Sequence, residues 1–197
     1  MSYMTGVNIA SATINPRHRA YEIYVAGCTR SCPGCHNPEL HPFAAKGFRE
    51  WAVWWRRHSH EFREPSPLFD KIWLLGGDLL CHEAWAVSDM LHTLKETGLP
   101  LWLWTGAERE EVERKAAEYG LDAFTFIKTG PYQQDLSGVI CCWNDAEGAD
   151  GYFRLASWNQ RLWRVISGSG RRWFSLEPAG PILPVEAEAE AAETEAW

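Results

Sequence analysis

The chain has 197 residues, 46% of them hydrophobic, and this length allows one domain with a substantial buried core. Its formal net charge of -7 at pH 7 argues against general nucleic-acid binding, which needs a basic surface. No apolar run is long enough to cross a membrane and no apolar signal segment stands at the N-terminus, so we expect a cytoplasmic protein in a reducing compartment.

The first predicted strand covers residues 21–26 and leads directly into a cysteine-rich loop. Cys28, Cys32 and Cys35 follow it with the spacing C-x3-C-x2-C. Three thiolates this close in sequence can converge on one metal centre, and iron-sulfur clusters depend strongly on cysteine ligands. A four-iron cluster held by three cysteines keeps one iron without a cysteine ligand, which indicates chemistry at that iron.

Two other interpretations of the cysteines stay open. A structural zinc ion could use the three sulfurs and His36, although tetrahedral zinc sites usually join two short knuckles that are distant in sequence. Disulfides could form, because Cys81, Cys141 and Cys142 complete an even number, but a reducing compartment disfavours them.

The next segment, residues 48–62, combines tryptophans with arginines and histidines. Aromatic and cationic side chains together can stack nucleotides. The spacing of Trp51, Trp54 and Trp55 instead favours a helix with one apolar and one solvated face.

Three further strand-like runs follow, at residues 71–76, 100–104 and 123–128, and helical patterns separate them. This alternation predicts β-α-β units and a parallel sheet. The short chain cannot close eight repeats, so we expect an α/β fold built as an incomplete barrel, with a curved, mainly parallel sheet and helices outside.

Two helices are predicted between these strands. From Glu83 to Lys95 apolar residues recur at i, i+3, i+4 and i+7, and Gly98 ends the pattern. The second helix begins near Glu108, with acidic residues in its first turn, and ends at Gly120.

Short polar and glycine motifs follow the predicted strands. Gly76, Gly77 and Asp78 end one strand in a turn that would let a ligand approach the backbone, and Thr105 follows the next. Ligands of parallel α/β sheets bind at the carboxyl ends of the strands, so these motifs should converge on one face.

The cysteine spacing and its surroundings resemble the radical S-adenosylmethionine superfamily, whose signature is this loop after the first strand. More narrowly, residues 26–38 look like the activating proteins of anaerobic (class III) ribonucleoside-triphosphate reductases, with His36 in place of an aromatic residue. Four further segments resemble that family in the same order, namely residues 71–78, 99–106, 123–132 and 154–161. The chain departs from the family pattern at Leu79, at Trp158 and in residues 13–19.

The resemblance implies a [4Fe-4S] cluster held by Cys28, Cys32 and Cys35, with S-adenosyl-L-methionine bound at the remaining iron. Gly76, Gly77 and Asp78 would orient its methionine end, Asp78 by pairing with the amino group. The residues implied to bind the cofactor are Gly34, Cys35, His36, Gly76, Gly77, Asp78, Thr105 and Asn159, with Lys128 as a further candidate. No catalytic residue beyond the cluster and the cofactor is implied.

The implied activity is reductive cleavage of S-adenosylmethionine and formation of a glycyl radical on the partner. That partner would be the glycyl-radical subunit of anaerobic ribonucleotide reductase, and the electron donor a reductant such as flavodoxin or ferredoxin. Two alternatives are a compact radical enzyme that acts on a small molecule, like a deazapurine-forming synthase, and a non-enzymatic iron-sulfur or zinc binding module. The match at residues 154–161 favours the activase.

The chain is expected to divide near residue 180. Residues 1–180 would form the radical S-adenosylmethionine domain. Residues 181–197 are rich in alanine and glutamate without a compensating cation, a composition typical of a disordered acidic tail.

Overall fold

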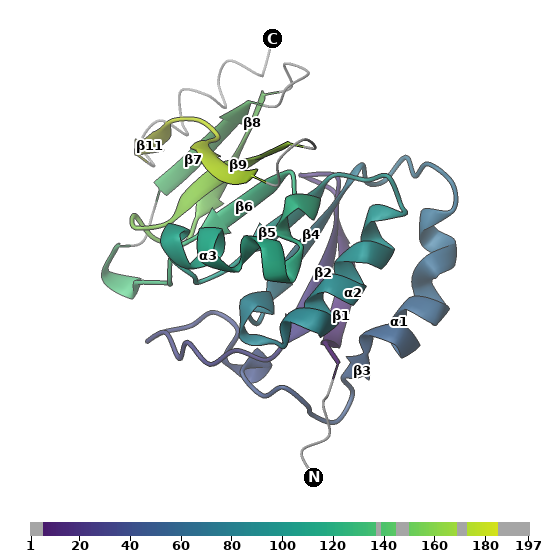
Figure 1. The fold of residues 1–197 in the computed structure, drawn as a ribbon. Helices are drawn as coiled ribbons and strands as arrows, with labels where there is room; N and C mark the ends of the chain where they lie inside the picture. The colour runs from purple at the N-terminus through teal and green to yellow at the C-terminus, as the bar shows by residue number, and fades with distance from the viewer. Residues whose placement is uncertain (1–5, 137–138, 145–149, 169–172, 185–197) are drawn as a thin grey trace.

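The computed structural model of the chain describes residues 6–136, 139–144, 150–168 and 173–184. Its strands form one sheet of eight and a second sheet of three (Figure 1). The strand order in the large sheet is β10-β9-β6-β5-β4-β2-β1-β3. These strands are β1 (Asn8–Asn15), β2 (Ala20–Ala26), β3 (Arg49–Glu50), β4 (Lys71–Gly76), β5 (Leu101–Trp104), β6 (Phe126–Thr129), β9 (Arg161–Gly168) and β10 (Trp173–Pro178).

The centre of the large sheet is parallel. Strands β2, β4, β5 and β6 pair in parallel, as the alternating strand and helix patterns predicted. On both sides the pairing changes, because β1 and β9 run antiparallel to β2 and β6. The sheet is therefore mixed, and the strands at the ends of its order, β10 and β3, do not pair with each other in the described part of the chain. An open sheet of this kind is compatible with the expected incomplete barrel.

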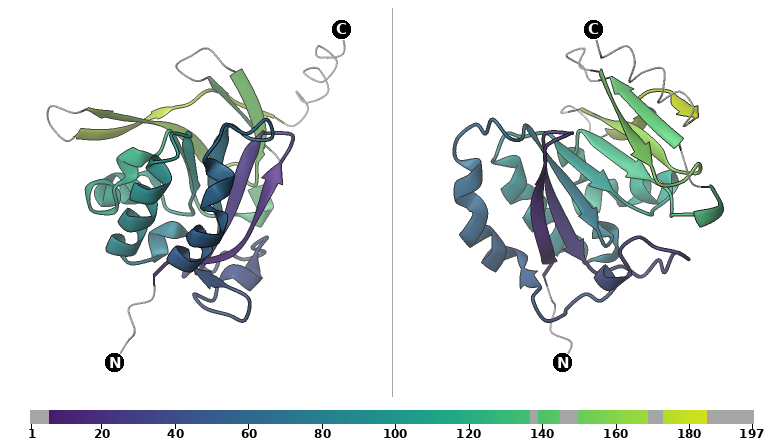
Figure 2. Two further views of the ribbon diagram at one scale, coloured as in Figure 1. Left: turned by 90° about the vertical axis from the view of Figure 1, so that its right-hand side faces the viewer. Right: turned by 180° about the vertical axis from the view of Figure 1, so that it is seen from behind.

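The three α-helices in the described part of the chain cover the same face of the large sheet (Figures 1 and 2). They are α1 (Trp51–His58), α2 (Ala84–Lys95) and α3 (Arg109–Tyr119). Alternate strand residues such as Ile72, Leu74 and Leu103 join the helices' apolar stripes in one buried core. The residues between them face the other side, where Trp73, Trp102 and Phe126 form a smaller aromatic core.

The predicted helices are confirmed. In α2 the residues with helical spacing, Val87, Met90, Leu91 and Leu94, are buried, and α3 ends at Gly120, whose φ of 71° is left-handed. Helix α1 buries two tryptophans and exposes its arginines, which agrees with the amphipathic helix predicted for residues 48–62.

The second sheet has the order β11-β7-β8, formed by β7 (Val139–Asn144), β8 (Asp150–Leu155) and β11 (Ile182–Pro184). Strand β11 lies inside the segment predicted as a tail. It pairs with β7, so residues 182–184 belong to the second sheet. The rest of that segment, residues 185–197, lies outside the described residues, as do the side chains of Cys141 and Cys142. None of the described helices has the length and apolar character that a membrane span requires.

Candidate metal centre

The cysteine loop leaves the end of β2 and is fixed by backbone hydrogen bonds. Gly27 N donates to Leu40 O at 2.8 Å and Cys28 N to His41 O at 3.0 Å. These bonds join the beginning of the loop to the segment that follows the last cysteine. Within it, Cys35 N donates to Cys32 O at 3.1 Å. Gly34 adopts a φ of 68° at the centre of that turn, a conformation that favours glycine.

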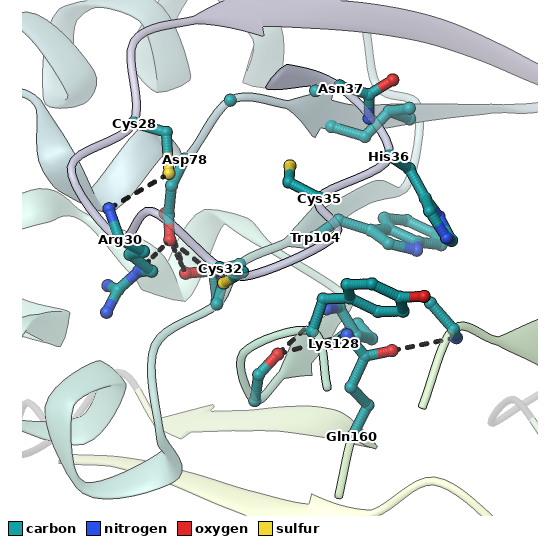
Figure 3. Close-up of a pocket in the computed structure, with 18 of the residues that line it drawn as sticks. Cys28, Arg30, Cys32, Cys35, His36, Asn37, Asp78, Trp104, Lys128 and Gln160 are labelled. Atoms are coloured by element: carbon teal, nitrogen blue, oxygen red, sulfur yellow. Dashed lines mark hydrogen bonds and ion pairs between the residues drawn. The ribbon is translucent and has the colours of Figure 1, made fainter. Parts of the chain in front are cut away.

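The three cysteines line one cavity of about 220 Å³ (Figure 3). Its walls come from the carboxyl ends of parallel strands β4, β5 and β6, which is where the strand-end motifs predicted a site. Residues of the predicted set that line it are Cys28, Cys32, Cys35, His36, Gly76, Gly77, Asp78, Thr105 and Lys128. Sequence reasoning did not select further lining residues, among them Arg30, Trp104, Tyr132, Arg154 and Gln160.

Two predicted site residues, Gly34 and Asn159, are not part of the lining. Asn159 donates its side-chain amide to Pro131 O at 2.7 Å and so supports the loop after β6. Its neighbour Gln160 reaches the cavity and donates to Gly130 O at 3.3 Å. This segment therefore lines the cavity through Gln160, and not through the predicted Asn159.

The spread of the cysteines fits a cluster better than a single ion. A tetrahedral zinc ion needs its ligand atoms about 2.0–2.3 Å away, and no three His, Cys, Asp or Glu side chains in the described residues come close enough to hold one ion. In a four-iron cluster each thiolate binds a different iron, so the sulfurs need only surround a common space. Cys28, Cys32 and Cys35 do so around this cavity.

The Asp78 carboxylate holds the cysteine loop to the neighbouring strand ends. It is 2% exposed and accepts hydrogen bonds from Leu80 N at 3.0 Å and Gly106 N at 3.0 Å. The Thr105 hydroxyl lies 2.8 and 2.9 Å from its two oxygens, so that its single proton can be shared between them, and Arg30 Nε forms a short ion pair with the carboxylate. Four donor groups thus already engage the carboxylate that was predicted to pair with the methionine amino group.

Arg30 stands inside the C-x3-C segment and connects it to α3. Its two terminal nitrogens donate to the Glu111 carboxylate at 3.1 and 3.0 Å, a bidentate pair. This hydrogen bonding lowers the pKa of Glu111. Since Arg30 also pairs with Asp78, one guanidinium joins three segments of the chain.

The paired glycines after β4 allow close packing of the chain on itself. Gly76 has a φ of 104°, which few other residues adopt. A Cβ on Gly77 would lie 2.6 Å from Gly27 O and 2.9 Å from Val25 O. The backbone that approaches these glycines is therefore that of the cysteine loop, although both also line the cavity.

Lys128, on β6, places a buried ammonium in the cavity wall. The residue is 6% exposed, and its Nζ donates to Gly130 O at 3.3 Å. Burial is the main cause that lowers its pKa to about 8, against the raising effect of Asp78 and Cys32. An ammonium has three donors, so this group can bind an anion that enters the cavity.

Aromatic rings stand at the opposite side of the cavity from Asp78 (Figure 3). The His36 and Tyr132 rings have centroids 4.5 Å apart and are tilted by 48°. Trp104 lines the cavity beside them. His36 is exposed, so these rings lie where the cavity meets solvent.

A fourth cysteine, Cys81, lies beside Cys28. Consecutive backbone amides donate to the two sulfurs, Thr29 N to Cys81 and Arg30 N to Cys28, each at 3.5 Å. The two thiols also hydrogen-bond to each other, which lowers the pKa of Cys81 to about 6 and raises that of Cys28. No sequence pattern indicated this contact, because the two residues are in separate motifs.

Comparison with known proteins supports the cluster. No curated protein matches the chain. The family described as "4Fe-4S single cluster domain", which is found in radical S-adenosylmethionine-type proteins, matches residues 18–144. This range holds the cysteine loop, helices α1, α2 and α3, and the four parallel strands. The chain therefore belongs to the 4Fe-4S single cluster domain family.

Proposed function

We propose that this chain is a radical S-adenosylmethionine enzyme, and that it generates a glycyl radical on anaerobic ribonucleotide reductase. One observation carries the first part: three cysteines of a single loop surround a cavity at the ends of parallel strands. A four-iron cluster held by them keeps one iron for a small-molecule ligand. The family match supplies the cluster type.

When bound, a reduced cluster supplies the electron that cleaves S-adenosylmethionine into methionine and a 5'-deoxyadenosyl radical. Cys28, Cys32 and Cys35 would hold that cluster. Lys128 is the buried cation best placed to pair with the methionine carboxylate, because it lines the same cavity and its pKa of about 8 keeps it mostly protonated near pH 7. The rings of His36 and Tyr132 offer a surface on which adenine can stack.

The structure of the Asp78 site changes how the strand-end motif would act. The Asp78 carboxylate is occupied by Arg30, Thr105 and two backbone amides. A direct contact with the methionine amino group would require it to exchange one of these partners. Its contribution to cofactor binding would otherwise be indirect, through the position of the cysteine loop.

The narrower assignment rests on the ordered resemblance of residues 26–38 and 154–161 to reductase activating proteins. Both segments contribute to one cavity, through the three cysteines and through Arg154, Leu155, Ala156 and Gln160. The cavity meets solvent beside the exposed residue His36, which lines it. A glycine-bearing loop of a partner protein could approach it there.

Isotope transfer tests the proposal. The anaerobically reconstituted chain is reduced and mixed with S-adenosylmethionine and an anaerobic reductase whose glycines carry deuterium at the α carbon. We expect methionine, a carbon-centred radical on the reductase, and 5'-deoxyadenosine that contains deuterium. Mass spectrometry and electron paramagnetic resonance measure these products.

The Cys32→Ala variant is the matched control and should give none of the three products. Cleavage without deuterium transfer to 5'-deoxyadenosine, for every reductase tried, would reject the activase and leave the radical chemistry in place. If the reconstituted protein failed to bind S-adenosylmethionine, both parts of the proposal would be wrong.

A further inference from the structure

Cys28 has two neighbours with which its sulfur could form a covalent bond. It lines the cavity that the cluster would fill, and it also contacts the thiol of Cys81. Cys81 is not part of the cavity lining. The contact between Cys28 and Cys81 is therefore separate from the cluster site, although it involves one of the cluster's ligands.

The backbone holds these two residues together independently of their side chains. Asp78 N donates to Gly27 O at 2.8 Å, which joins the residue before Cys28 to the start of the turn that contains Cys81. That turn is a short 3-10 helix, Leu79–Cys81, in which Cys81 N donates to Asp78 O at 2.9 Å. A disulfide requires α carbons about 4.4–6.8 Å apart and side chains that point toward each other. The paired segments place the Cys81 sulfur within hydrogen-bond distance of Thr29, the residue that follows Cys28.

Thr29, the residue after Cys28, holds the Cys81 sulfur in position next to the cysteine loop. Its backbone amide and its hydroxyl both donate to Cys81 Sγ, at 3.5 and 3.2 Å. Thiol–disulfide exchange begins with attack by a thiolate. Cys81 is half-buried rather than enclosed, so a small disulfide can reach it.

We propose that Cys28 and Cys81 form a reversible disulfide in the iron-free protein, and that this bond must be reduced before the cluster can be loaded. In the first step the Cys81 thiolate attacks a low-molecular-weight disulfide, forms a mixed disulfide and releases one thiol. Cys28 then attacks the sulfur of Cys81 and releases the second thiol. Two protein thiols are oxidised, one small disulfide is reduced to two thiols, and the two protein thiol protons pass to the departing thiolates.

The disulfide and the cluster exclude each other, because a sulfur in a disulfide is not available as a thiolate ligand. The bond would protect one cluster ligand from the irreversible oxidation that converts a free thiolate to sulfinic acid. The proposed disulfide goes beyond the radical chemistry of the proposed function. It requires only that Cys28 is a cluster ligand.

Peptide mapping of the full chain tests the proposal. Iron-free protein is treated anaerobically with oxidised glutathione, digested without reductant and examined by mass spectrometry. We expect one dominant cross-linked peptide pair, which joins Cys28 to Cys81, and its loss on treatment with dithiothreitol. The same treatment of the cluster-loaded protein should give none of this pair while the cluster's absorbance persists.

Iron uptake gives the second measurement. Wild-type protein pretreated with oxidised glutathione should take up iron and sulfide only after dithiothreitol is added. A Cys141→Ser variant serves as the control and should still form the Cys28–Cys81 pair. The proposal would be overturned by a dominant Cys32–Cys35 link, by stable glutathione adducts on Cys81, or by cluster loading that needs no reductant after the pretreatment.

Discussion

At the scale of single residues, the Asp78 carboxylate in the cavity wall accepts from four donor groups. The resemblance to radical S-adenosylmethionine proteins implied that this carboxylate pairs with the amino group of the methionine moiety. Its partners Arg30, Thr105 and Gly106 come from two other segments of the chain. Nothing in their spacing reveals that they meet, which is why this network was not predicted.

The Asp78→Asn substitution should destabilise the iron-free protein. Asparagine keeps the shape of the side chain but removes the charge that pairs with Arg30. Loss of a hydrogen bond to a charged group costs about 1.5–3 kcal/mol, so the free energy of unfolding in urea should fall by about 2 kcal/mol. Arg30→Met removes the same pair and should give a comparable loss, with a double variant that is less destabilised than the sum of the two.

The same variants separate a structural role of Asp78 from direct cofactor contact. If Asp78 acts through the loop, both variants should weaken S-adenosylmethionine binding by the cluster-loaded protein to a similar degree. Weaker binding in Asp78→Asn alone, with unchanged stability of the iron-free protein, would instead establish direct contact with the methionine amino group.

Lys128 should make stability depend on pH in the alkaline range. Its pKa is about 8 in the folded protein against an ordinary 10.5, because the charged form is buried. Between these values the unfolded chain binds the proton more tightly, so the free energy of unfolding contributed by this group rises with pH. Urea unfolding at several pH values should show this rise for wild type relative to Lys128→Met. Parallel curves for the two proteins from pH 8 to 10.5 would contradict the buried ammonium.

At the scale of elements, the turn after β4 and the cysteine loop form a single packed unit. Gly77→Ala should separate them, because its Cβ would lie 2.6 Å from Gly27 O, a backbone atom that cannot move without shifting Cys28. We expect reconstituted Gly77→Ala to contain much less iron per chain than wild type. Iron and sulfide assays measure this.

Gly98→Ala is the matched control. Gly98 has a φ of 71° and no atom within 4 Å of a built Cβ, so alanine there carries only backbone strain, about 1 kcal/mol. That variant should lose some stability and keep its full iron content. Equal iron content in both variants would show that the loop tolerates displacement from the β4 turn.

The elements differ in how well they could be predicted from the sequence. The four parallel strands are mainly apolar and have buried residues on both faces, although β2 contains Glu22 and β6 contains Lys128, and each was recognised. Strand β1 has the sequence NIASATIN and was missed, because its small and polar residues give a weak apolar signal. The antiparallel strands β9 and β10 contain arginine, serine and glutamate, and their place beside β6 depends on pairing across distant segments.

At the scale of the whole molecule, the larger hydrophobic core, on the helix face of the sheet, contains no part of the cysteine loop. The core between the sheet and the three helices includes no residue from 27 to 50. Replacement of Cys28, Cys32 or Cys35 by Ala should therefore abolish the four-iron cluster but leave cooperative unfolding of the iron-free chain. Near-ultraviolet circular dichroism of the tryptophans should stay close to that of iron-free wild type.

The Cys81→Ala variant provides the comparison and should retain a four-iron cluster whose reduced spectrum changes when S-adenosylmethionine is added. Stoichiometric zinc with no iron after anaerobic reconstitution of wild type would contradict the cluster. A non-cooperative transition in all three cysteine variants would show that the core itself requires the metal.

The large sequence separation between Arg30 and its partner Glu111 implies an order for folding and cluster insertion during synthesis. Glu111 is 81 residues further along the chain, so a ribosome must have released the start of α3 before the Arg30 guanidinium can find both of its carboxylates. By then β2, β4 and β5 have also been synthesised. Delivery of iron and sulfide to the cysteine loop is thus expected late in translation or after it, once those strands can fold around the site.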